Sequence, residues 1–356
     1  MLVVKSENFA TSSHLLCEDT GFVWSSTIPE TAVFADTGQR SFSELAKIFG
    51  YNVESFISEN YKNSAETIGT NPPWYFYIGK EKFIARIKEY SKSYKAFCES
   101  FDHEKINIQA SISQFIDELQ PANFDRRLVK PEYSAHFEKS IQPFLIGSIL
   151  PPPKYSRTKT KTGRMSVIEG PNVLTCHAGL RSGLVGAHQI DFVSMEPNFL
   201  LQFIGKKPTA NLYDDIRKEI FRDKISRAKV KVATISALYG SDRKDKFART
   251  ISDYFHVEEV IKSLEEKIVD DTIRNEYGRL IYLQGARGRH LLSLWLQSSA
   301  ADGALYGFYN FSQHNDIKPM WIIHDALIFI GNEKAISVKE LDIGFNTILP
   351  VKVDKL

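Results

Sequence analysis

Cysteine is scarce in this chain of 356 residues. Its three cysteines, Cys17, Cys98 and Cys176, are odd in number and far apart, and no two are arranged as Cys-x-x-Cys. This arrangement argues against a disulfide framework and against a cysteine-based zinc site. A reducing cytoplasm is therefore the expected location.

Long apolar runs are also missing from the sequence. No stretch approaches the ~20 consecutive apolar residues that a membrane-spanning helix needs. The first residues, Met-Leu-Val-Val-Lys-Ser-Glu, do not resemble a signal peptide. We therefore expect the protein to have no membrane partner.

An excess of one charge sign is the third absence. The chain has 45 Lys and Arg residues against 43 Asp and Glu residues, which gives a net charge of +2. This balance differs from that of a strongly basic, histone-like binder, so any contact with nucleic acid must come from local clusters of cations. The overall composition is that of a soluble globular protein, and the length allows one large domain or two to three smaller ones.

The stretch Trp321–Ile330 is the most informative part of the sequence. Eight of its ten residues are apolar or aromatic, and His324 and Asp325 stand in the middle. Such a run predicts a buried strand, where an uncompensated charge costs several kcal/mol. If the His-Asp pair forms a tight turn between two strands, the carboxylate emerges at the sheet surface and can hold a metal ion. The alternative is a buried Asp325 that caps its own turn.

A second aspartate ends another short apolar segment. Asp191 follows His188-Gln189-Ile190, and Glu196 comes five residues later. Two aspartates at the ends of separate strands suit two-metal phosphoryl transfer, because two divalent ions about 4 Å apart need carboxylates from more than one element.

Between these two aspartates lies a segment with an ordered helical face. Arg227, Lys231, Ile235 and Tyr239 are spaced four apart, so on a helix they lie along one side. Two cations, an apolar residue and an aromatic follow the order of a nucleoside triphosphate, with phosphates at one end and the base at the other. The alternative is an ordinary amphipathic helix with a basic exposed edge.

A basic segment precedes Asp191. Lys154–Arg164 contains five cations, no acid and many hydroxyl groups. This composition suits contact with a phosphate backbone, for which Lys159 and Lys161 are candidates. A solvated basic loop is the alternative.

These segments, in this order, resemble the family A DNA polymerases, the group of bacterial polymerase I and its phage relatives. Asp191–Glu196 is similar to motif A, Arg227–Gly240 to motif B, and His324-Asp325 to motif C. Three further segments add to the resemblance, which covers about residues 155 to 356: Thr162–Ser166, Tyr277–Tyr282 and Leu296–Asp302.

The resemblance implies an α+β fold of the right-hand polymerase kind, with an antiparallel palm sheet, helical fingers and a reduced helical thumb. The expected divisions are an N-terminal region of unknown role (1–105), the reduced thumb (106–153), palm with motif A (154–205), fingers with motif B (206–276) and palm with motif C (277–356). In the N-terminal region and thumb, residue spacing predicts a strand at 74–79 and helices at 80–101, 106–120 and 131–147.

The resemblance also implies an activity, a cofactor and partners. The activity is template-directed addition of deoxynucleotides to a primer 3′ end, in a bacterium or a phage-infected cell, with primer-template DNA and dNTPs as partners. Asp191 and Asp325 would hold two Mg²⁺ ions, and the backbone carbonyl of Phe192 would complete one coordination shell.

Further roles follow from positions that match the family's motifs. Arg227 and Lys231 would bind the triphosphate, and Lys231 is a candidate proton donor to pyrophosphate. Tyr239 would lie by the templating base, Ile235 would lie against the sugar and base, and Glu196 would form a steric gate against the ribose 2′-hydroxyl. The positions that match contacts with the primer terminus or minor groove are Arg164, Arg289, Gln297 and His324.

The chain departs from the family pattern at two positions. Ala326 stands where a second carboxylate is usual, and Ile235 stands where an aromatic residue is usual. In addition, no Asp-x-Glu opens an apolar strand in residues 1 to 150, so no proofreading exonuclease is expected.

Two alternatives from other classes stay open. One is a catalytically weak or inactive polymerase-like protein that holds primer-template DNA, and retention of Asp191 and Asp325 argues against it. The other is an RNA-synthesising relative, and Glu196 argues against it because a gate at this position excludes ribonucleotides.

Overall fold

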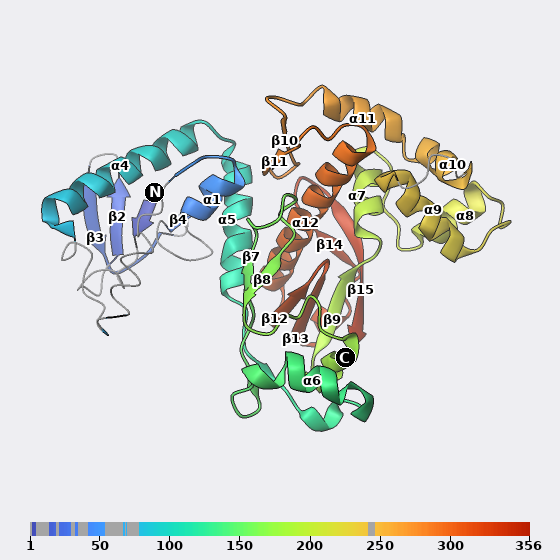
Figure 1. Ribbon diagram of the computed structural model, residues 1–356, viewed down its shortest axis with the longest axis horizontal. Coiled ribbons are helices and arrows are strands. Elements are labelled where there is room, and N and C mark those ends of the chain that lie inside the picture. Colours follow the sequence, from blue (N-terminus) through green and yellow to red (C-terminus); the bar gives the residue numbers. More distant parts are fainter. Residues whose placement is uncertain are drawn as a thin grey trace. The chain divides into compact units, whose positions relative to one another are not determined.

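The chain divides into two compact units, Met1–Asp117 and Glu118–Leu356, in a computed structural model (Figure 1). The structure describes residues 2–4, 14–18, 21–29, 33–34, 42–53, 67, 69, 78–240 and 246–356. In these ranges no helix is both long and apolar enough to cross a membrane.

The first unit combines a small sheet with helices. The strands lie in the order β3-β2-β1-β4, with β1 antiparallel to β2 and parallel to β4. Their bounds are Leu2–Val4 (β1), His14–Glu18 (β2), Gly21–Ser25 (β3) and Val33–Phe34 (β4). The helices are α1 (Phe42–Ile48), α4 (Lys80–Glu99) and α5 (His103–Asp117).

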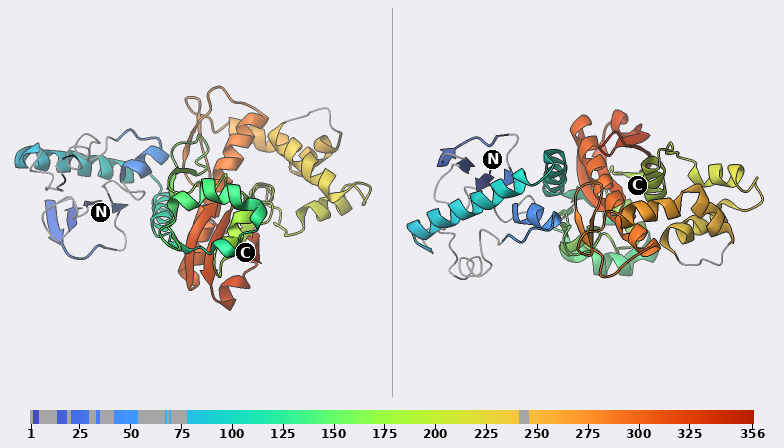
Figure 2. Two further views of the ribbon diagram at one scale, coloured as in Figure 1. Left: turned by 60° about the horizontal axis from the view of Figure 1, so that its bottom comes forward. Right: turned by 90° about the horizontal axis from the view of Figure 1, so that it is seen from above.

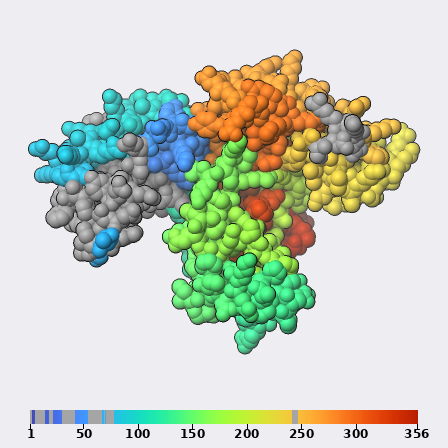
Figure 3. Space-filling model, viewed as in Figure 1, coloured from blue at the N-terminus to red at the C-terminus, as the bar shows by residue number. Residues whose placement is uncertain are grey.

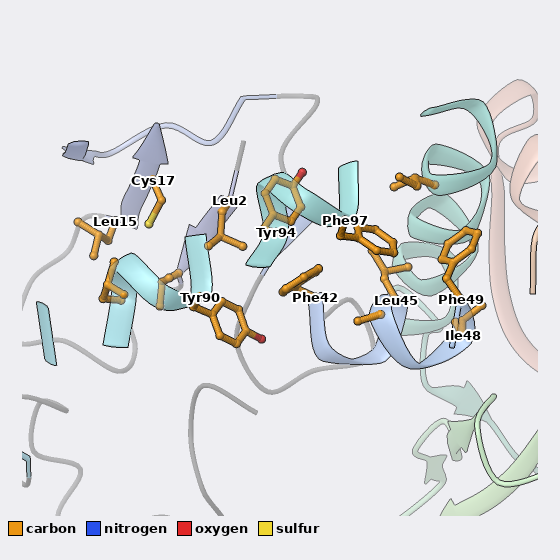
Figure 4. Packing of buried hydrophobic residues seen from close by; sticks show 14 of the residues in the cluster. Leu2, Leu15, Cys17, Phe42, Leu45, Ile48, Phe49, Tyr90, Tyr94 and Phe97 are labelled. Atoms are coloured by element: carbon orange, nitrogen blue, oxygen red, sulfur yellow. The ribbon is translucent and has the colours of Figure 1, made fainter. Parts of the chain in front are cut away.

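An aromatic core holds this unit together. The ring of Phe42 lies 5.2 Å from that of Tyr94 and 5.6 Å from that of Phe97, both edge-on (Figure 4). Tyr94 and Phe97 lie on α4, as the helical spacing over 80–101 predicts, and both are buried. The predicted strand at 74–79 falls largely outside the described residues.

The boundary of the first unit differs from the predicted division after residue 105. Ile106 on α5 is buried in the same core cluster as Phe42. The whole of α5 therefore belongs to the first unit, which ends at Asp117.

A five-stranded antiparallel sheet forms the centre of the second unit. The strand order is β12-β13-β9-β15-β14. The bounds are His188–Phe192 (β9), Ile317–Ile323 (β12), Ala326–Gly331 (β13), Glu340–Asp342 (β14) and Ile348–Lys355 (β15). Ile323 pairs with Ala326, so His324 and Asp325 form the two-residue turn of a hairpin, as predicted.

Two helices pack against one face of this sheet. They are α7 (Met195–Phe203) and α12 (Arg289–His314). The ring centres of Phe192 in β9 and Phe308 in α12 lie 5.4 Å apart. A Cβ on Gly307 would lie only 2.9 Å from the Phe192 ring. The close fit shows that Phe192 points toward α12, so its neighbour Asp191 points to the opposite face.

Four further helices gather beside α12 (Figure 1, Figure 2). They are α8 (Leu212–Glu219), α9 (Arg227–Tyr239), α10 (Lys246–Tyr254) and α11 (Val257–Glu265). The helix predicted from the spacing of Arg227 to Tyr239 is confirmed as α9. The hairpin of β10 (Thr272–Arg274) and β11 (Leu280–Tyr282) leads from α11 toward α12, and α13 (Glu333–Ile336) follows β13.

Short elements fill residues 118 to 184. They are β5 (Ala122–Asn123), η2 (Arg126–Leu128), η3 (Pro131–Tyr133), α6 (Ser134–Ser140), η4 (Gln142–Phe144), β6 (Ile149–Leu150), β7 (Lys154–Ser156), β8 (Ser166–Glu169) and η5 (Ala178–Gly183). The single helix predicted over 131–147 is wrong, because two short 3-10 turns flank α6; Pro131 begins the first, and Pro143 lies within the second.

Candidate active site

Asp191 lies near the end of β9, between two partner strands. It pairs in register with Ala326 of β13 and with Lys352 of β15. These neighbours share its face of the sheet, the face opposite α12. The main chain then turns sharply at Ser194, which has a φ of 51°, and α7 begins at Met195.

Asp325 lies at the hairpin turn beside Asp191. His324 has a φ of 55°, a conformation that is uncommon for a residue other than glycine and is often found at functional sites. The backbone N–H of Phe192 donates to the carbonyl oxygen of Asp325 over 3.2 Å. This bond fixes the His324-Asp325 turn against the end of β9 and makes the two aspartates neighbours.

Burial and a neighbouring carboxylate raise the pKa of each of the two aspartates. Burial, then the charge of Asp325, raises the pKa of Asp191 to about 6, against the opposing influence of Arg181. Burial, then the charge of Glu196, also raises the pKa of Asp325. Desolvated like charges of this kind are typical of functional sites, where a cation compensates them.

The donor set fits a hard divalent cation only with help from a substrate. Among the described residues, no group of three or more His, Cys, Asp or Glu side chains could hold a metal ion. Mg²⁺, however, is commonly held by one or two carboxylates together with substrate phosphates and water. Asp191 and Asp325 meet that requirement, whereas the buried Ala326 supplies no third carboxylate.

A cavity of about 340 Å³ opens beside Asp325. It brings together five of the residues predicted from the sequence: Arg164, Glu196, Gln297, His324 and Asp325. Ala300, Ala301 and Ala304 of α12 form an apolar part of its wall. In Figure 3, red atoms of the C-terminal part of the chain are visible between light-green atoms of the segment that follows residue 150.

Arg164 and Glu196 form an ion pair within this cavity. An Nη of Arg164 lies 2.5 Å from Oε1 of Glu196, and the side chains are 49% and 23% exposed. Glu196 occupies the first turn of α7, where the helix dipole favours a negative charge. The predicted gate residue is therefore already held by a cation.

The turn that carries Arg164 packs against a buried ionic cluster. Asp302 of α12 is fully buried and accepts two hydrogen bonds from Arg279, over 2.9 and 2.8 Å. Arg157, also buried, lies 3.5 Å from the same carboxylate. Gly163 has a φ of 72°, and a Cβ there would lie 2.3 Å from Nε of Arg279.

Three of the segments that carry the family resemblance meet at this cluster. Burial alone would raise the pKa of Asp302, but the charge and hydrogen bonds of Arg279 outweigh it and lower the pKa. Thr162–Ser166, Tyr277–Tyr282 and Leu296–Asp302 thus meet at one point in the protein core. The pairing of Arg279 with Asp302 was not predicted from the sequence.

One cation of the basic segment is buried and has a structural role. Arg157 belongs to the basic segment Lys154–Arg164, but its side chain is only 1% exposed and faces Asp302. Lys154 pairs with Glu169 over 2.7 Å. Lys159 and Lys161 are exposed, and Lys161 donates to Gln284.

The predicted nucleotide-binding face of α9 is open. Arg227, Lys231 and Ile235 are exposed, whereas Val230, Ala233, Thr234, Ala237 and Leu238 face the interior. Arg227 pairs with Asp214 over 3.2 Å and lies over the ring of Tyr213. Among the described residues, Lys231 forms no ion pair.

The charge of Glu196 influences the pKa of two tyrosines, Tyr213 on α8 and Tyr239 on α9. Burial, then the charge of Glu196, raises the pKa of Tyr239. Burial raises the pKa of the Tyr213 hydroxyl; the charge of Glu196 acts in the same direction, and the Ser194 hydrogen bond and the Arg227 charge oppose it. Tyr213 was not singled out from the sequence, because an aromatic residue in an amphipathic helix gives no signal beyond core packing.

Arg289 is engaged in protein contacts at the start of α12. It donates to the carbonyl of Ala237 in α9, to Ser252 of α10 over 3.0 Å and to Glu258 of α11 over 2.9 Å. The structure therefore places it as a clamp between four helices, while its predicted contact with DNA stays a prediction.

Comparisons with solved structures give a weak likeness to a polymerase domain. No family model matches the chain, and no curated protein matches it. The POL domain of Pol1 from M. smegmatis, solved in complex with DNA primer-template and dNTP, is similar with a TM-score of 0.43 and 16% sequence identity. The similarity covers 86% of this chain and 56% of that chain. Because both measures are low, the function proposed below rests on the geometry of the site.

Proposed function

We propose that this protein is a template-directed DNA polymerase that adds deoxynucleotides to a primer 3′ end without proofreading. The observation that carries the proposal is the meeting of Asp191 and Asp325. They come from segments far apart in sequence and become neighbours where β9 meets the β12–β13 turn, and Asp325 borders a cavity lined by Arg164, Glu196, Gln297 and His324. Paired carboxylates next to a cavity with cationic and amide donors suit phosphoryl transfer on a nucleic acid.

In this proposal the five-stranded sheet acts as the palm and α8 to α11 act as the fingers. The segment from 118 to 153 is what remains of the predicted thumb. The open face of α9 receives the triphosphate, with Arg227 exchanging Asp214 for a phosphate group and Lys231 donating a proton to the leaving pyrophosphate. Gln297 and His324 contact the primer terminus, where minor-groove acceptors report pair geometry rather than base identity.

Asp191 and Asp325 would hold two Mg²⁺ ions, with the Phe192 carbonyl as a further ligand. When bound, the ions supply a lowered pKa for the primer 3′-hydroxyl and charge compensation for the triphosphate. Lys159 and Lys161, both exposed, would contact the phosphate backbone, while Arg289 keeps the fingers helices together near the template.

Ala326 favours a second candidate function. It pairs directly with Asp191 and offers no carboxylate. A site with two acidic ligands instead of three binds a cation less tightly, so the protein could hold primer-template DNA and act on it weakly or not at all.

A primer-extension assay tests the proposal. A labelled primer is incubated with Mg²⁺ and dNTPs, once annealed to a template and once alone, and in parallel with rNTPs. We expect extension that requires the template and prefers dNTPs. Template-dependent extension by rNTPs at an equal or higher rate would favour the RNA-synthesising alternative. DNA binding without extension, up to high Mg²⁺ or Mn²⁺ concentration, would favour the second candidate.

A further inference from the structure

We propose that Arg164 is the positioning residue of the sugar gate: its guanidinium holds the Glu196 carboxylate and so sets the preference for deoxynucleotides. The inference rests on the proposed function and assigns the residue on which its sugar selectivity depends. The geometry behind it is the ion pair of 2.5 Å within the cavity that also contains Asp325.

Arg164 is the fixed end of this pair. The hydroxyl of Thr160 donates to the Arg164 carbonyl over 2.7 Å, and Gly163 lies directly against the buried Arg279 guanidinium. Arg279 is in turn bound to Asp302 by two hydrogen bonds in the core. The backbone of Arg164 is therefore held in place by contacts with the buried Arg279–Asp302 pair.

Position 235, on the neighbouring helix α9, offers Glu196 no polar partner. Ile235 lies on the exposed face of α9 and has no group that can hydrogen-bond a carboxylate. Among the described residues, Arg164 is the cation that lies within ion-pair distance of Glu196. Without Arg164 the three rotatable bonds of the glutamate would leave its carboxylate free to move away from an incoming 2′-hydroxyl.

Solvent weakens the ion pair between Arg164 and Glu196, and this limits its effect on sugar selectivity. The Arg164 side chain is 49% exposed, so the pair is worth less than a buried ion pair. We expect loss of Arg164 to lower the discrimination ratio, kcat/KM for dATP over kcat/KM for ATP, by roughly three- to tenfold. The ratio is the informative readout because any common effect of Arg164 on primer binding or on Asp325 cancels in it.

A double-mutant cycle tests the proposal. Single-nucleotide insertion opposite template T is measured with dATP and ATP for the wild type, Arg164→Gln, Glu196→Ala and the double variant. We expect each single variant to lower the ratio and the double variant to match Glu196→Ala, because Arg164 acts through Glu196. Arg164→Lys, which keeps the charge, should recover part of the ratio.

Arg287→Gln is the matched control. Arg287 pairs with Asp271 over 2.9 Å and its side chain is also 49% exposed, but it does not line the cavity. Its loss should leave the ratio unchanged. The proposal is overturned if Arg164→Gln leaves the ratio at its wild-type value, or lowers it equally with and without Glu196.

A binding measurement separates this proposal from the proposed function. The dissociation constants of dATP and ATP are measured on the complex of each variant with a primer-template whose primer ends in a dideoxynucleotide. If the wild type extends no primer, the proposed function fails, while the ratio of the two constants still tests the role of Arg164. If the wild type binds the two nucleotides equally, or binds neither, the gate and its positioning residue are both overturned.

Discussion

Asp191 is a carboxyl group that folding makes harder to ionise. Its pKa is raised to about 6 by burial and by the neighbouring Asp325, from an ordinary value of 3.8. The folded protein therefore binds a proton at this position more tightly than the unfolded chain does. The consequence is a loss of stability that is fully present above pH 6 and disappears below pH 4, where both states are protonated.

Asp191→Asn should accordingly stabilise the metal-free protein. We expect a gain of roughly 1–2 kcal/mol in the free energy of unfolding at pH 8, after allowance for partial solvent exposure, and no gain near pH 4. Urea titrations of both proteins in EDTA at the two pH values measure it. A destabilised variant at pH 8 would show that a protein cation already compensates Asp191.

Single residues were predictable from the sequence where their chemistry was conspicuous. Asp191, Asp325, Glu196 and Arg164 were all singled out. The structure brings Asp325, Glu196 and Arg164 to one cavity and Asp191 next to Asp325. Arg157 was misleading, because a cation in a basic loop looks the same whether it faces solvent or, as here, a buried Asp302. Only the fold decides between the two.

The elements around the site depend on tight turns. The hairpin at His324-Asp325 was predictable, because two charged residues interrupt an apolar run. The turn at Gly163 was not, because its requirement for glycine comes from Arg279, more than 100 residues later. Long-range contacts of this kind leave no local pattern.

Gly163→Ala tests that contact. The added Cβ would lie 2.3 Å from Nε of Arg279, so we expect a loss of about 2–4 kcal/mol in stability, from overpacking and from the positive φ together. Gly186→Ala is the control, because Gly186 has a similar φ of 69° and nothing within 4 Å of the added atom. It should lose only about 1 kcal/mol. Equal losses in chemical denaturation would mean that the Arg279 contact contributes nothing.

At the scale of the whole molecule, the chain consists of two units with separate cores. The first is built around Phe42 and the aromatic side of α4, and the second around the five-stranded sheet and α12. The sequence pointed to an N-terminal region of unknown role but placed its end too early, since α5 has an apolar stripe that fits a core in either unit. The expected lack of proofreading stays a prediction.

Residues 118–356 should fold without the first unit. All the residues proposed for catalysis and binding lie in this range, which forms a compact unit with its own buried apolar side chains. We expect a single cooperative thermal transition and a near-UV circular dichroism spectrum with fixed aromatic side chains. A non-cooperative transition would mean that the second unit depends on the first for its stability.

The central claim is that Asp191 and Asp325 together carry out nucleotide transfer, and three variants test it most directly. Asp191→Asn, Asp325→Asn and Asp354→Asn are compared by single-turnover primer extension and by equilibrium binding to primer-template DNA. Asp354 is the control, because it lies on the same sheet face, pairs in register with Gln189 and influences the pKa of Asp191, but stands outside the proposed site. We predict that the first two variants lose at least about 10³-fold in rate with DNA binding retained, and that Asp354→Asn stays within about threefold of the wild type. Substantial extension by either Asp191→Asn or Asp325→Asn would contradict the account.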